Sequence, residues 1–149
     1  MKKFKFKLEP LLRYRSFQEH QKKLAVAAAR HDVMICEAAI EEMTLLSRAT
    51  AETLSSAMTN GMDAIRFEWY NHYLEGLSSL RVSQEARRLE LIRALARKQQ
   101  ELTEKSVARK VVENLKARKK EDYYREALKT EQKTLDDMVI LRSARKVAE

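Results

Sequence analysis

The sequence predicts an all-α protein, an elongated antiparallel hairpin of two long helices that pair as a coiled coil. Three observations favour this fold: only 2 Gly and 1 Pro among 149 residues, a charged fraction of 35%, and a hydrophobic fraction of 44% with helical spacing. A sheet needs turn residues about every 8–12 positions, and a phosphate-binding loop needs several glycines, so both are excluded. Such a chain has a thin seam and little interior for an enzyme pocket.

The length allows a single domain, residues 1–149, which the few helix breakers divide into four parts. We expect a basic arm at 1–8, a first helix at about 9–60, an aromatic connection or short helix at about 61–80, and a second helix at about 80–145. The arm alternates Lys and Phe, which fits a short strand or a flexible arm. The flexible arm is favoured because no other segment offers a strand to pair with.

The first helix begins near Pro10, which suits a first helical turn because its missing N–H has no partner there. Apolar residues then recur in an a/d heptad pattern typical of a coiled-coil seam. Other registers stay open, because neighbouring positions such as Leu24 and Ile35, and Leu45 and Leu46, are also apolar. The predicted seam consists of Val26, Ala29, Val33, Cys36, Ile40, Met43, Leu54 and Ala57.

The turn is predicted at Asn60-Gly61, where either residue can take the left-handed conformation that ends a helix. Asp63 is a candidate N-cap for the next helical segment. The second helix carries two heptad pairs, Leu95 with Leu102 and Leu128 with Leu135. At 1.5 Å per residue the two helices would be roughly 75 Å and 100 Å long.

No constellation of residues predicts catalysis, a cofactor or a metal ion. The three histidines are far apart in sequence, and adjacent acidic pairs such as Asp136-Asp137 point about 100° apart on a helix. Cys36 is the only cysteine and lies on the predicted seam, so it is read as a small buried hydrophobe in a reducing compartment. No apolar stretch is long enough for a membrane span or a signal peptide, and we expect a cytoplasmic, non-enzymatic protein.

The net charge of +8 is concentrated in the second half of the chain: residues 1–75 carry +1 and residues 76–149 carry +7. Basic ends favour an acidic partner surface, which leaves protein, nucleic acid and anionic lipid open. Aromatic residues do not interleave with most of the basic residues, so a base-stacking surface is a weak hypothesis and no nucleic acid is expected.

Four of the ten aromatic residues lie in the segment 63–80. Two interpretations stay open: these residues plug the end of the hairpin, or some of them form an exposed patch that binds a partner. One face at helical spacing would comprise Tyr73, Leu77, Leu80 and Gln84.

Four stretches of the sequence resemble the FliJ family of bacterial flagellar export. The opening Phe-Lys-Phe-Lys-Leu-Glu-Pro-Leu-Leu-Arg-Tyr-Arg, residues 4–15, is similar to the start of these proteins, as is Leu24-Ala25 after a Glu/Gln/Lys-rich stretch. Residues 115–126 and 131–137 resemble the family's C-terminal pattern.

The resemblance implies a cytoplasmic antiparallel coiled coil of the flagellar type III export apparatus, peripheral to the inner membrane at the flagellar base and needed for motility. Such proteins resemble a rotary ATPase stalk: their paired termini engage the export ATPase hexamer, their other end contacts the cytoplasmic domain of the export gate, and they assist substrate chaperones. The implied ATPase contacts are Arg13, Arg15, Asp136, Arg142 and Arg145. The implied gate contacts are Tyr73, Leu77, Leu80 and Gln84, although family members can carry histidine at the place of Gln84.

Two alternatives to this function remain at the level of sequence. One is a basic coiled coil that binds nucleic acid, whose affinity would fall steeply with salt. The other is the equivalent stalk of a virulence type III secretion system, which sequence physics does not separate from the flagellar one.

Overall fold

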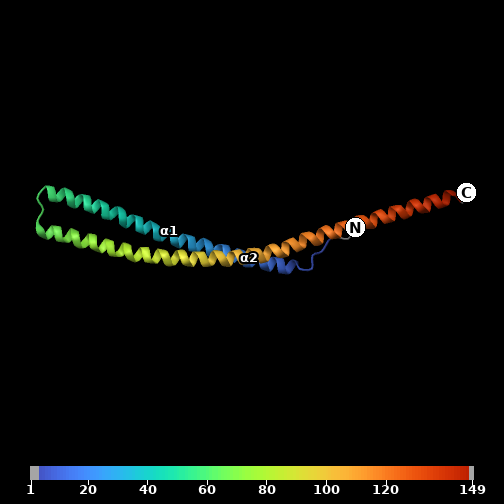
Figure 1. Ribbon diagram of the computed structural model, residues 1–149, viewed down its shortest axis with the longest axis horizontal. Helices are drawn as coiled ribbons and strands as arrows, with labels where there is room; N and C mark the ends of the chain where they lie inside the picture. Colours follow the sequence, from blue (N-terminus) through green and yellow to red (C-terminus); the bar gives the residue numbers. More distant parts are fainter. Residues whose placement is uncertain (1–3, 148–149) are drawn as a thin grey trace. The chain divides into compact units, whose positions relative to one another are not determined.

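The structure, a computed structural model, describes residues 4–147, and for 144–147 the backbone only. It contains two α-helices, α1 (Glu9–Thr59) and α2 (Ala64–Val147), and no strand within the described range (Figure 1). The predicted fold class, two long helices packed against each other, is confirmed. None of the described helices has a stretch that is both long and apolar enough to span a bilayer.

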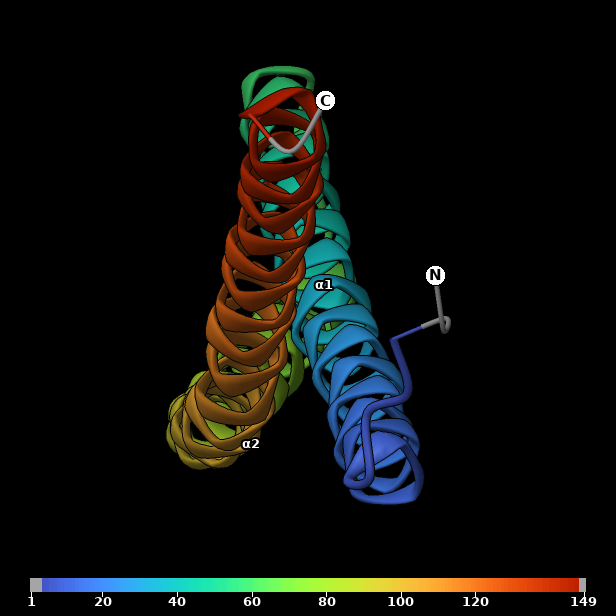
Figure 2. The ribbon, with the colours of Figure 1, turned by 90° about the vertical axis from the view of Figure 1, so that its right-hand side faces the viewer.

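Contacts divide the chain into two units. The turn unit comprises Gln21–Thr103, and the terminal unit joins the part of the chain up to His20 to the part from Glu104 on. Within each unit α1 and α2 run antiparallel, because higher numbers in α1 face lower numbers in α2 (Figures 1 and 2). Ion pairs that cross between the helices include Lys22–Glu101 and Glu37–Arg88 in the turn unit, and Glu9–Lys116 and Glu19–Arg109 in the terminal unit. A single domain over the whole chain stays a prediction.

The turn between the helices forms at Gly61, as the sequence predicts. Gly61 has φ of 82°, and its N–H donates to the carbonyl oxygen of Met58 at 3.3 Å. A side chain there would strain the backbone even though no other atom lies within 4 Å of its would-be Cβ. Asp63 precedes α2 and accepts the first helical hydrogen bond from the N–H of Phe67 at 3.1 Å. The chain therefore reverses within about four residues.

The aromatic segment is not a connection or a separate short helix. α2 begins at Ala64 and continues without a break through Gly76, so the predicted start near residue 80 is wrong. Gly76 lowers helix propensity by about 1 kcal/mol relative to Ala. Leu77, 8% exposed, and the half-buried Leu74 pack on the seam on either side of it. Tertiary packing of this helix face outweighs the local propensity.

The predicted heptad register of α1 is confirmed. Four of its positions form the buried core of this helix, and the other four are half-buried. The apolar residues of the competing registers, Leu24, Ile35, Leu45 and Leu46, are 43–59% exposed. The buried positions are Val26, Ala29, Cys36 and Leu54.

The seam of α2 ends before its second predicted heptad pair. Leu95 and Leu102 are half-buried, as expected, and Val112 is 9% exposed. Leu128 and Leu135 are 63% and 62% exposed, so they are not part of the hairpin seam. The reason is length: α1 begins at Glu9, which pairs with Lys116, and no helical residue precedes it in the described chain.

Candidate functional site

The four predicted gate residues do not share one exposed face. Leu77 is 8% exposed and lies in the seam. Gln84 is half-buried, and both its backbone and side-chain oxygens lie 3.5 Å from the Sγ of Cys36 on α1. Tyr73 and Leu80 point outward, with 47% and 55% of their surface exposed. Two of these residues therefore build the hairpin, and two are available to a partner.

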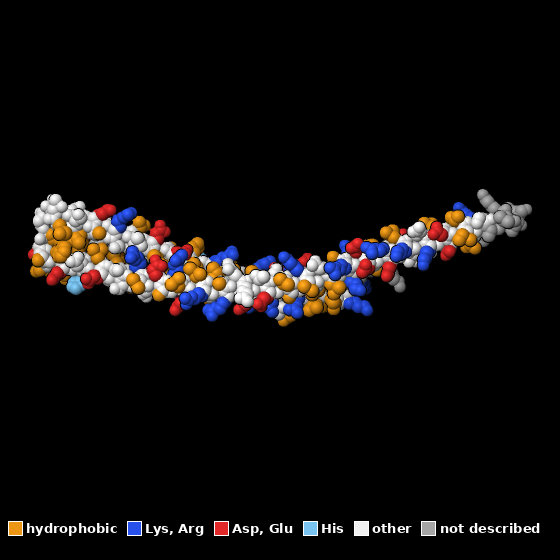
Figure 3. Space-filling model, in the orientation of Figure 1, with side chains coloured by type: hydrophobic (Ala, Val, Ile, Leu, Met, Phe, Trp, Pro, Cys, Tyr) orange, Lys and Arg blue, Asp and Glu red, His pale blue; other side chains and the backbone are white. Residues whose placement is uncertain are grey.

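A different apolar face emerges at the start of α2. Trp69 is 75% exposed and Ile65 is 65% exposed, and with Tyr73 and Leu80 they recur at intervals of four, four and seven residues. That spacing places them on one side of the helix. We call these four residues the tip face. Figure 3 shows hydrophobic side chains gathered near the turn.

The sequence revealed the aromatic cluster but not which of its residues would be exposed. Ile65 and Trp69 became recognisable only once Leu74 and Leu77 were known to occupy the seam. With three quarters of its surface exposed, Trp69 is not a structural plug of the hairpin. A contiguous apolar face of this kind marks an interaction site on many proteins.

The predicted ATPase contacts all belong to the terminal unit but are not joined to one another. Arg13 is exposed, and the half-buried Arg15 donates from Nη1 to Oε1 of Gln18 at 3.5 Å. Asp136 and Arg142 lie in the stretch 131–143, where every residue is exposed. The side chain of Arg145 lies outside the described residues. Among those described, no ion pair or hydrogen bond links the α1 arginines to the α2 residues.

A charged layer that sequence analysis missed crosses the seam of the terminal unit. Glu19 is only 6% exposed, and its carboxylate lies 2.5 Å from Nε of Arg109. Nη1 of the same guanidinium lies 2.6 Å from Glu113. Burial lowers the pKa of Arg109, but the two neighbouring carboxylates outweigh that effect and raise it. The sequence did offer one sign that Glu19 lies in the seam, because it precedes the seam residue Val26 by seven residues.

Two further ion pairs join the helices of the turn unit. Nζ of Lys22 lies 2.5 Å from Glu101, and its hydrogen bond and charge lower the pKa of that carboxyl. Nε of Arg88 donates to Glu37 at 2.8 Å, and the same two effects raise the pKa of Arg88. These side chains are 37–49% exposed, so each pair sets register more than it adds stability.

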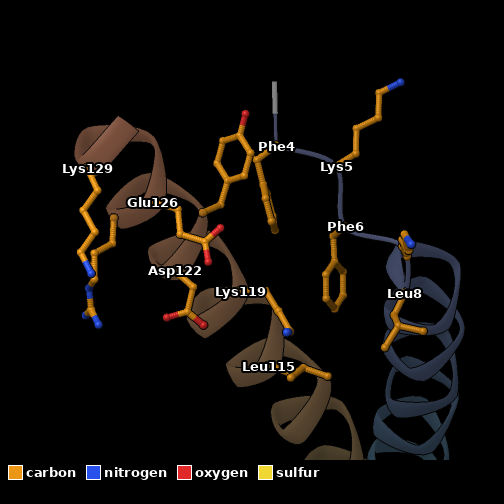
Figure 4. Close-up of a pocket in the computed structure, with 12 residues that line it drawn as sticks. Phe4, Lys5, Phe6, Leu8, Leu115, Lys119, Asp122, Glu126 and Lys129 are labelled. Atoms are coloured by element: carbon orange, nitrogen blue, oxygen red, sulfur yellow. The ribbon is translucent and has the colours of Figure 1, made fainter. Parts of the chain in front are cut away.

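The terminal unit also contains a cleft between residues 4–8 and α2 (Figure 4). Its volume is about 830 Å³, and the ring of Phe4 lies 5.7 Å from that of Tyr123. The described part of the predicted arm, residues 4–8, is therefore seated against α2, and no strand forms within it. Over the described part of the chain, no group of three or more His, Cys, Asp or Glu residues is arranged to hold a metal ion.

Comparison with known families identifies the chain. A sequence model described as the flagellar FliJ protein matches residues 4–148. The chain belongs to the FliJ family. Neither the search of curated proteins nor that of solved structures returned a match.

Membership of the FliJ family indicates the setting in which the chain works. Proteins of this family are non-catalytic components of export, and membership implies that this chain is a component of the flagellar export apparatus.

Proposed function

We propose that the protein is a stalk that links the export ATPase hexamer to the cytoplasmic domain of the export gate and assists substrate chaperones. It would work in the cytoplasm at the inner membrane of the flagellar base. The observation that carries the proposal is the tip face, because an exposed Trp beside Tyr and Leu is typical of the anchors of protein interfaces. Family membership supports the flagellar setting.

The tip face is the proposed contact for the export gate. Tyr73 and Leu80, the exposed members of the predicted set, would touch the gate together with Trp69. Leu77 and Gln84 would not touch the gate. Their contacts in the seam would instead fix the rotation of α2 that exposes the tip face. Trp69→Ala should then weaken binding of the protein to the gate domain and leave its helicity almost unchanged.

The terminal unit is the proposed contact for the ATPase. Arg13, Arg15, Asp136, Arg142 and Arg145 are the proposed polar contacts. The exposure of every residue from 131 to 143 supports this assignment, since a helical stretch that long gains stability from a surface to pack against.

Titration of the protein into purified export ATPase tests the proposal. We expect stimulation of ATP hydrolysis that saturates at about one protein per hexamer, together with increased hexamer assembly by light scattering. Arg142→Glu should weaken both effects, whereas Arg48→Glu, an exposed arginine of α1 in the turn unit, should leave them unchanged. No change in turnover or assembly with the wild-type protein would contradict the stalk function.

A further inference from the structure

The cleft of the terminal unit has a shape suited to a polypeptide segment. Among the described residues, two stretches of chain line it: residues 4–8 and the face of α2 from Leu115 to Lys129 (Figure 4). With two walls, the cleft is open to solvent along its length. The α2 wall comprises the 15 residues from Leu115 to Lys129, whose 14 steps of 1.5 Å give a length of about 21 Å, or about four helical turns. An open trough of this length accepts side chains from another chain.

Apolar side chains contribute part of the lining of the cleft. Phe4 and Phe6 are half-buried and point toward α2, whereas Lys5 and Lys7 are exposed, as the alternation of the arm requires (Figure 4). On the other side, Leu115 is 38% exposed. The cleft therefore leaves apolar surface exposed to water. Apolar side chains of a partner would cover that surface.

The rim of the cleft is positively charged. Five cations line it against two carboxylates. Arg125 pairs with Glu121 at 3.0 Å, but Lys119 and Lys129 form no ion pair with any residue that the structure describes. The cations are Lys5, Lys7, Lys119, Arg125 and Lys129, and the carboxylates are Asp122 and Glu126.

We propose that this cleft binds an acidic segment of a partner polypeptide that inserts apolar side chains between Phe6 and Leu115. Its carboxylates lie against Lys119 and Lys129, the cations that have no ion-pair partner among the described residues. The identity of the partner as the export ATPase rests on the proposed function, whereas the chemistry of the bound segment follows from the cleft alone.

A designed peptide probes the site directly. The probe is a fluorescein-labelled 15-residue helix of Glu and Ala with Leu at every third or fourth position, and its anisotropy is followed as the full-length protein is added. We expect saturable binding at physiological salt. A peptide with Ser in place of Leu and one with Lys in place of Glu should both fail to bind, because each removes one of the two complementary features.

Matched variants locate binding at the cleft. Lys119→Glu should weaken peptide binding about threefold to tenfold, and Phe6→Ser should do so at least as strongly. Lys120→Glu is the control: it makes the same charge change on the adjacent residue, which does not line the cleft, and should shift affinity less than twofold. Glu126→Gln should tighten binding, because it removes a carboxylate from the cleft. Circular dichroism checks that helicity and melting temperature are retained.

Three outcomes would overturn the assignment: no saturable binding, equal weakening by Lys119→Glu and Lys120→Glu, or equally tight binding of a single-stranded oligonucleotide that Lys119→Glu also weakens. The last would assign the cleft to a nucleic acid instead. The ATPase titration is read separately. If the peptide binds the cleft but the protein fails to stimulate the ATPase, the stalk function fails while the cleft assignment stands.

Discussion

Leu77 and Leu80 provide the sharpest test of how α2 is rotated in the hairpin. Both were expected on one binding face, but Leu77 is 8% exposed and Leu80 is 55% exposed. Truncation to Ala removes three carbon groups, each stabilising by about 0.8 kcal/mol when buried. Leu77→Ala should therefore cost about 2 kcal/mol in transfer free energy, and about 2–3 kcal/mol with the residual cavity of a seam that can partly close. Leu80→Ala should cost about 1 kcal/mol.

Urea denaturation followed by far-UV circular dichroism measures both costs. With a slope of roughly 2 kcal/mol per molar urea, Leu77→Ala should lower the midpoint by about 1 M and Leu80→Ala by about half that. Leu77→Met nearly conserves volume and should recover most of the loss. Gate binding should respond in the opposite order, with the larger effect from Leu80→Ala.

Equal midpoints for Leu77→Ala and Leu80→Ala would refute the assigned rotation of α2. So would a larger loss for Leu80→Ala. Loss of gate binding by Leu77→Ala at unchanged stability would return that residue to the exposed face expected from the sequence.

Three further predictions concern the ion pairs, the glycines and the end of α2. The pKa of Glu101 is lower in the folded protein than in the unfolded chain, where it is about 4.3, so its pair with Lys22 stabilises the fold above that unfolded pKa. Wild type should therefore have a higher urea midpoint than Glu101→Gln at pH 7. This difference in midpoint should vanish as the pH falls through the folded-state pKa of Glu101. Gly61→Ala should destabilise the fold by about 1–2 kcal/mol, because the residue has a positive φ. Gly76→Ala should stabilise it by about 0.4–1 kcal/mol, because the residue lies within α2 and no atom lies within 4 Å of the added Cβ. Thermal melting measures both changes. Amide hydrogens of residues 131–143 should exchange faster than those of the seam, as measured by mass spectrometry, because this stretch buries no side chain; equal protection would contradict its isolation.

The sequence predicted most of the seam because heptad spacing repeats a local rule. Val26, Ala29 and Cys36 were placed correctly by counting alone, and Gly61 by its rarity. The same counting misjudged Leu135, since a heptad pattern shows that a face is apolar but not whether a partner helix reaches it. It also missed the nearly buried Glu19, because charged residues are assigned to the surface unless an opposing charge is known.

By itself the sequence determined that the protein is two long helices with one reversal and that it carries the motifs of a flagellar export family. Composition, spacing and the few breakers are local properties, so one chain is enough to read them. Only the tertiary structure decided which residues of the aromatic segment are exposed and which are buried in the seam. The rotation of α2 buries Leu77 and exposes Trp69, and the seating of Phe4 on Tyr123 turns a basic arm into one wall of a cleft. Both depend on how one helix packs against residues distant in sequence, which no local pattern specifies.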